Sequence, residues 1–153
     1  EVTKIFYYGT GVSSEKNQQL IQSAFAAHFP NAIVEVGWDL LAAARALCGD
    51  ERGIACILGT GSNSCLYDGE KIIRNVANLG WILADEGSGT SLGKQIVFDY
   101  FRGNMPDKLA TQFQARFPWS REEVLEKVYQ QEKPGAFLAS FSKFIFQHLN
   151  EPY

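Results

Sequence analysis

The sequence has few residues that could hold a metal or a disulfide framework. Its 153 residues include only three cysteines, Cys48, Cys56 and Cys65, and two histidines. The cysteines are odd in number and lack both CxxC and His-paired spacing, which argues against a disulfide framework and a zinc site. We therefore expect three small apolar residues in a reducing compartment and no metal held by the protein.

A surplus of charge of one sign and long apolar runs are also missing. Lys and Arg number 14 against 17 Asp and Glu, a net charge of −3, so the chain lacks the basic excess that nucleic-acid binding requires. The longest apolar runs, residues 40–44 and 54–58, are far shorter than the roughly 20 residues of a membrane-spanning helix. No basic-then-apolar secretory segment opens the chain. We expect a globular, cytoplasmic protein without nucleic-acid or membrane partners.

Common catalytic signatures are absent as well. The chain contains no GxxxxGK[ST] sequence and no GxGxxG sequence. His28 and His148 fall on apolar faces of expected helices without suitably placed acidic partners. A Ser-His-Asp or Cys-His nucleophile is therefore not supported.

The first 50 residues alternate between strand and helix patterns. Residues 4–8 form a β-branched and aromatic run closed by Gly9-Thr10-Gly11, and residues 32–36 form a second strand-like run. A helix pattern follows each run, the second over residues 38–48. Strand, helix, strand and helix in this order predict a parallel α/β architecture.

After residues 48–52 the pattern changes to a new sheet. Three strand candidates follow in quick succession, residues 54–58, 64–67 and 71–76. Asp68-Gly69 is a strong hairpin signal between the last two, so we expect an antiparallel meander.

The rest of the chain is expected to be helical. A helix is predicted over residues 90–102, and Ser120 to Glu123 forms a capping box ahead of another. Pro134-Gly135 interrupts the chain before a last helix, whose apolar stripe we interpret as core; it consists of Phe137, Leu138, Phe141, Phe144, Ile145 and Leu149.

Gly59-Thr60-Gly61-Ser62-Asn63 lies between two strand candidates. Such a loop can turn several backbone N–H groups and hydroxyls towards one point, which suits an anion such as phosphate. An ordinary Gly-rich turn explains the same residues equally well.

Two further sites carry acidic residues. Asp85-Glu86-Gly87-Ser88-Gly89 precedes an expected helix, where acids favour the helix dipole, but two acids with two glycines exceed what a cap needs. These acids could hold sugar hydroxyls or a hydrated metal. Asp39 follows a strand and fits either a first-turn helix acid or a general base at the carboxyl end of a strand.

The order and separation of these sites resemble the N-acetylglucosamine kinase family. The matching segments are Gly9-Thr10-Gly11, Trp38 to Arg45, Gly59 to Asn63 and Gly80 to Gly89. The activator ATPases of 2-hydroxyacyl-CoA dehydratases share the pattern more loosely. The resemblance implies an α/β fold of the ribonuclease H-like, actin-like ATPase type, in which two domains close on ATP with the sugar between them.

The resemblance also implies roles for individual residues. Asp39 matches the catalytic base, and Gly59, Thr60, Gly61 and Ser62 match a phosphate loop. Asn63 and Asp85 match positions that hold sugar hydroxyls, and the adjacent Glu86 is a further candidate. ATP with Mg²⁺ is the expected cofactor, an amino sugar such as N-acetylglucosamine the expected substrate, and a homodimer is compatible with the sequence.

On this basis we expect parts of two α/β domains. Residues 1–50 would end the first domain, residues 51–103 would begin the second, and residues 104–153 would form a helical insertion. The family's first phosphate loop and its adenosine-binding segment are not recognisable, so the sequence resembles the middle half of such a kinase. An activator ATPase, which would need cluster-ligating cysteines, and a non-catalytic sugar or nucleotide sensor stay open as alternatives.

Overall fold

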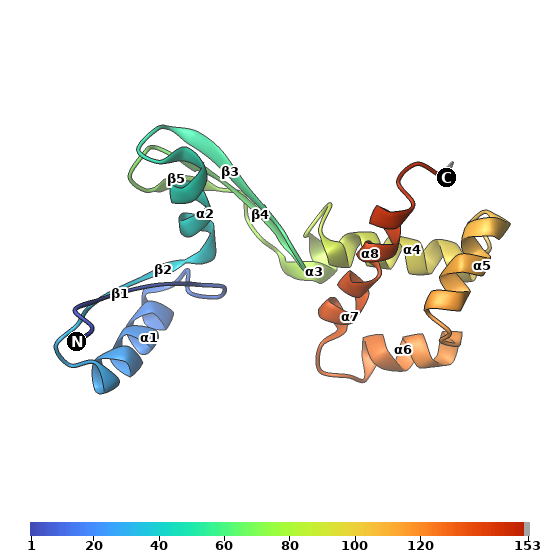
Figure 1. The fold of residues 1–153 in the computed structure, drawn as a ribbon, viewed down its shortest axis with the longest axis horizontal. Helices are drawn as coiled ribbons and strands as arrows, with labels where there is room; N and C mark the ends of the chain where they lie inside the picture. The colour runs from blue at the N-terminus through green and yellow to red at the C-terminus, as the bar shows by residue number, and fades with distance from the viewer. Residues whose placement is uncertain (152–153) are drawn as a thin grey trace. The chain divides into compact units, whose positions relative to one another are not determined.

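The computed structural model describes residues 1–151, which begin with a parallel strand-helix-strand unit. Strand β1 (Lys4–Gly9) pairs in parallel with β2 (Ile33–Trp38), so that Lys4 lies opposite Ile33 and Gly9 opposite Trp38. Helix α1 (Glu15–His28) connects them and packs on the sheet through the rings of Tyr7 and Phe25, whose centroids are 5.6 Å apart (Figure 1). The predicted parallel α/β arrangement is present here.

Helix α2 (Asp39–Cys48) follows β2 directly and covers a second sheet. This sheet has the order β3 (Gly53–Leu58), β4 (Ser62–Tyr67) and β5 (Ile72–Asn75), with β4 and β5 antiparallel. Leu40 and Ala44 of α2 pack against sheet residues in one core cluster; its buried members are Leu40, Ala44, Ala55, Cys65 and Tyr67. The three predicted strands are therefore present, in the predicted order.

The start of strand β4 differs from the expectation. Strand β4 begins at Ser62, two residues before the predicted strand, so Ser62 and Asn63 belong to the strand and only residues 59–61 form the connection. A connection of three residues is compatible only with an antiparallel β3–β4 pair.

Two compact units divide the chain. The first consists of Glu1–Ile57 with Asn63–Val76, and the second of Leu58–Ser62 with the chain from Ala77 onward. These units group β3, β4 and β5 with α2, because the sheet and this helix share a core. The expected division at residues 50 and 103 concerns the domains of a larger fold and stays a prediction.

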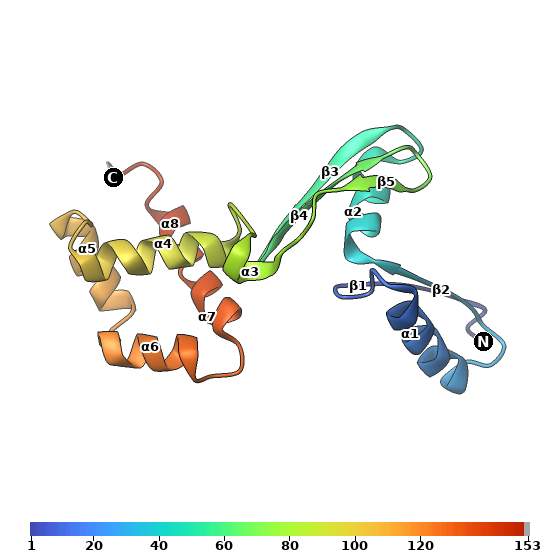
Figure 2. The same cartoon turned by 180° about the vertical axis from the view of Figure 1, so that it is seen from behind.

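The second unit is helical apart from its loop. It contains α3 (Gly80–Leu83), α4 (Gly89–Arg102), α5 (Asp107–Arg116), α6 (Arg121–Tyr129), α7 (Pro134–Ser140) and α8 (Ser142–Gln147) (Figure 2). Gly103 ends α4 at a left-handed φ of 70°, a conformation in which glycine has no steric penalty. The capping box predicted for α6 is confirmed, since Ser120 and Glu123 each accept a hydrogen bond from the other's backbone N–H.

The expected single last helix is wrong. Pro134 opens α7, and the helical path is interrupted at Phe141 before α8 begins. The hydroxyls of Ser140 and Ser142 donate to the carbonyls of Phe137 and Ala139 at 2.6 and 2.7 Å. Such serine bonds compete with the helical backbone pattern, which accounts for the break.

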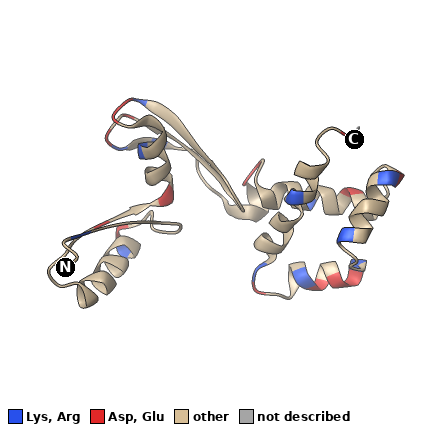
Figure 3. Ribbon diagram, in the orientation of Figure 1, with Lys and Arg blue, Asp and Glu red and all other residues tan. Residues whose placement is uncertain are grey.

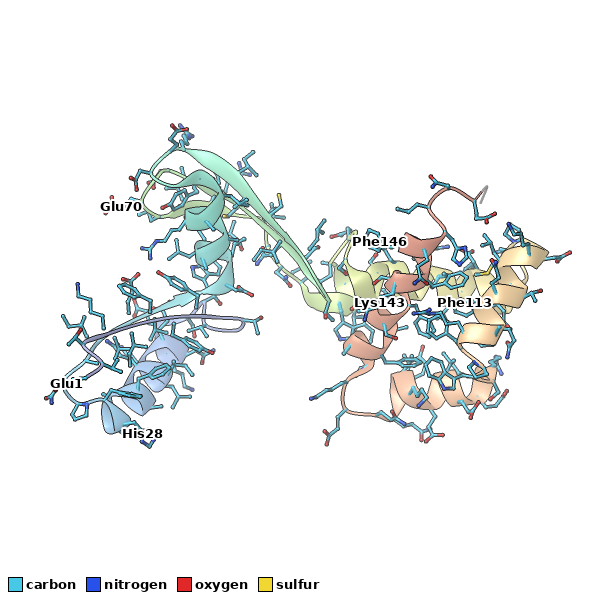
Figure 4. All side chains as sticks on the ribbon, viewed as in Figure 1. Glu1, His28, Glu70, Phe113, Lys143 and Phe146 are labelled. Atoms are coloured by element: carbon cyan, nitrogen blue, oxygen red, sulfur yellow. The ribbon has the colours of Figure 1, made fainter. Side chains whose placement is uncertain are left out.

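The predicted apolar stripe of the last helical segment contributes to the core of the second unit, except for Leu149, which is 66% exposed. The buried members of this core are Ile96, Met105, Leu109, Phe113, Phe141 and Phe144. The ring of Phe113, labelled in Figure 4, stacks on the ring of Phe141 with centroids 5.6 Å apart. Helices α4 and α7 approach closely at Gly93, where a Cβ would lie 1.9 Å from the carbonyl oxygen of Leu138.

Charged and apolar side chains both reach the surface. Figure 3 shows Lys and Arg interspersed with Asp and Glu in both units. Several large apolar side chains of the two sheets are exposed; they include Phe6, Ile33, Ile54 and Leu58. No helix within residues 1–151 is long and apolar enough to cross a membrane.

Candidate phosphate and substrate site

The connection between β3 and β4 is a tight loop with free donors. The Gly59 N–H donates to the Gly61 carbonyl over 2.8 Å, which closes the loop. The N–H groups of Thr60 and Gly61 donate to no acceptor in residues 1–151, and Thr60 is exposed. Adjacent amide donors without a protein partner suit an anion such as a phosphate group.

The carbonyl groups of this loop accept hydrogen bonds from the first residues of helix α4. The N–H of Gly89 donates to the Gly59 carbonyl over 2.8 Å, and the N–H of Thr90 donates to the Thr60 carbonyl over 3.1 Å. The Ser88 hydroxyl accepts the next donor, the N–H of Ser91, over 3.1 Å. The first donors of α4 are thus used within the protein, while the loop keeps its own free N–H groups.

Gly89 serves a contact within the protein. A Cβ at this position would lie 3.0 Å from the Cβ of Ala139 and 3.2 Å from the Gly59 carbonyl oxygen. The absence of a side chain at Gly89 therefore makes room for helix α7 and the loop.

Asp85 lies against the same loop. Its side chain is buried, with 7% of the residue exposed, and its Oδ1 accepts from the Ser62 N–H over 3.1 Å. A Cβ on Gly61 would lie 2.8 Å from Asp85 Oδ2, so the absence of a side chain on Gly61 makes room for the carboxylate. Helix α4 is capped by Ser88, and Asp85 instead binds the strand that follows the loop.

Asp85 also has a strained backbone. Its φ of 64° is the one positive value at a non-glycine residue in the described part of the chain. The left-handed backbone conformation raises the free energy of a non-glycine residue. It persists where surrounding contacts hold the residue in place. A buried, strained carboxylate beside a donor-rich loop is typical of a ligand site.

Asn78 is a participant that sequence reasoning missed. Its Nδ2 donates to Asp85 Oδ1 over 3.2 Å and to the Ser62 carbonyl over 3.0 Å. Its Oδ1 accepts from the Gly80 N–H over 2.7 Å. An asparagine shortly before a glycine is common in turns, so the sequence offered no signal for this role.

Glu86 is not part of this network. It is exposed and makes no hydrogen bond or ion pair within residues 1–151. The structure thus joins Gly59, Thr60, Gly61, Ser62 and Asp85 by direct contacts, whereas Glu86 stays a candidate by its position in the motif alone.

Asn63 and Asn75 form a pair in the first unit. The Nδ2 of Asn75 donates to Asn63 Oδ1 and to the Ser64 carbonyl, both over 2.8 Å. Asn63 Oδ1 also accepts from the Ser64 N–H over 2.9 Å. With its oxygen doubly occupied, Asn63 can offer a ligand only the donors of its Nδ2. Sequence analysis did not identify Asn75.

Asp39 opens helix α2 at the carboxyl end of β2, as its position in the sequence predicts. Its Oδ1 accepts from the adjacent Leu40 N–H over 2.9 Å, and the side chain is half-buried. Its Oδ2 makes no hydrogen bond within residues 1–151. This geometry is compatible with both the helix-acid and the general-base interpretation.

Helix α2 is also fastened to the first sheet by a polar cluster that the sequence did not predict. Arg45 Nη1 donates to Glu35 Oε1 over 2.6 Å, and the Tyr8 hydroxyl donates to the same oxygen over 2.9 Å. Arg45 also donates to the Tyr8 hydroxyl. The hydrogen bond from Arg45 lowers the pKa of the Glu35 carboxyl, and burial raises the pKa of Tyr8. A Cβ at Gly37 would lie 2.8 Å from the Tyr8 ring, so glycine makes room for it.

The chain has a close structural relative. It aligns over 97% of its length with the crystal structure of a protein from Porphyromonas gingivalis that is provisionally assigned as an N-acetylglucosamine kinase, at 45% identity and a TM-score of 0.93. The resemblance to the N-acetylglucosamine kinase family is confirmed. The chain covers 53% of that protein and thus spans about half of its length. No protein-family profile matches the chain, and no curated protein sequence matches it.

The N-acetylglucosamine kinase resemblance extends over the whole candidate site. The alignment leaves only 3% of this chain unmatched, so the loop, the Asp85 segment and the helices that carry them lie almost entirely within the shared fold. The roles of the individual site residues stay predictions.

The cysteines are distributed over different environments. Cys65 is buried in the core between α2 and the second sheet, where burial raises the pKa of its thiol. Cys56 is exposed on the neighbouring strand, and Cys48 is half-buried near the end of α2. No group of three or more His, Cys, Asp or Glu residues within residues 1–151 could hold a metal ion.

Proposed function

We propose that this protein transfers the γ-phosphoryl group of ATP to a hydroxyl of an amino sugar, N-acetylglucosamine being the first choice. The observation that carries this proposal is the contact between the donor-rich loop and the buried Asp85. Loop and carboxylate supply the two kinds of group that the reaction needs, donors for phosphate and an acceptor for a sugar hydroxyl.

The fold proposed for this reaction is the ribonuclease H-like, actin-like ATPase type. The parallel β1–α1–β2 unit and the β3–β4–β5 sheet support it. Residues 1–50 would end the first domain, residues 51–103 would begin the second, and residues 104–153 would be a helical insertion.

The loop would hold phosphate oxygens of ATP. The free N–H groups of Thr60 and Gly61 donate, and the hydroxyls of Thr60 and Ser62 are further donors without a partner in residues 1–151. Mg²⁺ bound to the nucleotide would neutralise charge on the transferred phosphoryl group. Mg²⁺ usually takes phosphate oxygens and several waters as ligands beside one or two carboxylates, so it would not need a three-ligand cluster, and the described residues offer none.

Asp39 would act as the general base. Its Oδ1 is held by the Leu40 N–H, which leaves Oδ2 to accept the proton of the attacking sugar hydroxyl. As that oxygen forms its bond to the γ-phosphorus, the bond from phosphorus to the bridging oxygen breaks and ADP leaves. The products are the sugar phosphate, ADP and one proton on Asp39, which solvent removes.

Asn63, Asp85 and Glu86 would bind the sugar. Asn63 would donate through Nδ2, because Asn75 and Ser64 occupy its oxygen. Asp85 would accept a hydrogen bond from a sugar hydroxyl through Oδ2, because the Ser62 N–H and Asn78 Nδ2 already donate to its Oδ1.

A coupled assay of ADP release with ATP, Mg²⁺ and a panel of amino sugars tests the proposal. We expect sugar-dependent ADP release with N-acetylglucosamine among the accepted sugars. ATP hydrolysis that is independent of every sugar would favour an activator ATPase, and sugar binding without turnover would favour a sensor. The separate environments of Cys56 and Cys65 already disfavour the activator, which needs ligating cysteines in one place.

A further inference from the structure

Asn78 uses both donors of its amide and its acceptor oxygen within the candidate site. The two hydrogens of Nδ2 serve Asp85 Oδ1 and the Ser62 carbonyl, at 3.2 and 3.0 Å, and Oδ1 accepts from the Gly80 N–H at 2.7 Å. The opposite amide orientation would set oxygen against the carboxylate and the carbonyl, and nitrogen against the Gly80 N–H. The three partners therefore fix one orientation of the amide.

This fixed amide determines which oxygen of Asp85 is available. Oδ1 accepts from both Ser62 and Asn78, whereas Oδ2 makes no hydrogen bond within residues 1–151. Oδ2 lies on the Gly61 side, where the loop has no side chain to cover it. Asp85 has a left-handed backbone, so its carboxylate depends on such contacts to keep its position.

We infer that Asn78 is a positioning residue that holds Oδ1 of Asp85 so that Oδ2 faces the sugar substrate. The inference deepens the proposed function and rests on it for the identity of the ligand. The hydrogen bond from Asn78 to Asp85 is present whichever ligand binds at Asp85.

Two substitutions of Asn78 separate positioning from a role in the turn. Asn78→Asp keeps an acceptor for the Gly80 N–H but sets a second carboxylate oxygen against Asp85 and the Ser62 carbonyl. Asn78→Ala removes all three bonds without adding repulsion. If Asn78 positions Asp85, the Asp variant is the worse one; if it only supports the turn at Gly80, the Asp variant resembles the wild type.

Asn104→Ala is the matched control. Asn104 Nδ2 donates to Asp99 Oδ1 over 3.2 Å, the same distance and the same pair of groups as between Asn78 and Asp85, at the far end of α4. The Asn104→Ala substitution removes an equivalent hydrogen bond at a place away from the site.

Steady-state kinetics of the complete gene product give the first readout. We expect the KM for N-acetylglucosamine to rise about tenfold in Asn78→Ala, the worth of one hydrogen bond to a charged group, and further in Asn78→Asp. The KM for ATP should change less than twofold and kcat should fall less than the sugar KM rises, with Asn104→Ala unchanged. An Asn78→Asp variant with the wild-type sugar KM, or equal losses for sugar and ATP, would overturn the inference.

Amide hydrogen exchange at Ser62 gives a readout that needs no activity. This N–H is bound to Asp85 Oδ1, the oxygen that Asn78 holds, and Asn78 also binds the carbonyl of the same residue. We expect exchange about tenfold faster in Asn78→Asp than in the wild type, and unchanged in Asn104→Ala. If the wild type phosphorylates no sugar, the proposed function fails, and unchanged Ser62 exchange would then refute the positioning role as well.

Discussion

The close contact between Gly61 and Asp85 leads to a sharp prediction for Gly61→Ala. The new Cβ would lie 2.8 Å from Asp85 Oδ2 and 3.1 Å from both Cγ and Oδ1, closer than carbon and oxygen normally approach. Asp85 is 7% exposed and held by Ser62 and Asn78, so it cannot turn aside without losing those bonds. Either the loop or the carboxylate must move.

The expected cost follows from the bonds at risk. Two hydrogen bonds to an ionised carboxylate contribute about 1.5–3 kcal/mol each, and a partial displacement would forfeit part of both. We therefore expect Gly61→Ala to lower the free energy of unfolding by about 1–3 kcal/mol and to weaken sugar binding about tenfold or more. Urea unfolding and calorimetric titration with N-acetylglucosamine measure the two effects.

Gly59→Ala is the control in the same loop, because its nearest neighbour would be the Gly61 carbonyl oxygen at 4.0 Å. A double-mutant cycle tests the cause: with Asp85→Ala in the background, the stability cost of Gly61→Ala should vanish, since the clash is gone. Equal stability of Gly61→Ala and Gly59→Ala, or additive losses in the cycle, would refute the reasoning.

Three other predictions concern single groups. Asp39→Asn should lower kcat by about two to four orders of magnitude with little change in sugar affinity, which single-turnover kinetics and calorimetry would show; retained turnover would make Asp39 a helix acid. Asp85→Ala should weaken sugar binding about tenfold or more and leave ATP binding unaltered, and the reverse pattern in titrations would place Asp85 with the nucleotide. The hydrogen bond from Arg45 lowers the pKa of Glu35, so their pair stabilises the fold at neutral pH and ceases to do so as the pH falls through that lowered pKa and Glu35 is protonated. Because these side chains are 41% and 44% exposed, Arg45→Met should cost at most about 1 kcal/mol near pH 7 and progressively less in acid in urea unfolding; a pH-independent cost would indicate lost packing instead.

Local patterns in the sequence determined the elements and their order. The strand and helix runs of the first 50 residues, the hairpin at Asp68-Gly69 and the capping box at Ser120 depend on residues within a few positions of one another. The two Gly-rich motifs were recognisable for the same reason. Short-range spacing sets the preference for strand, helix and turn, so these features could be predicted without the fold.

Only the tertiary structure decided which groups meet. The Ser62 N–H and the Asp85 carboxylate are 23 positions apart, and the Tyr8 hydroxyl and Glu35 are 27 apart. Asn78 contacts Asp85 across 7 positions that include the short helix α3. Such partners depend on how loops and helices pack against each other, which a single sequence does not encode in any local spacing. The sequence thus identified Asp85 as a candidate, and the packing of the loop on α4 determined that one of its two oxygens is held and the other is free.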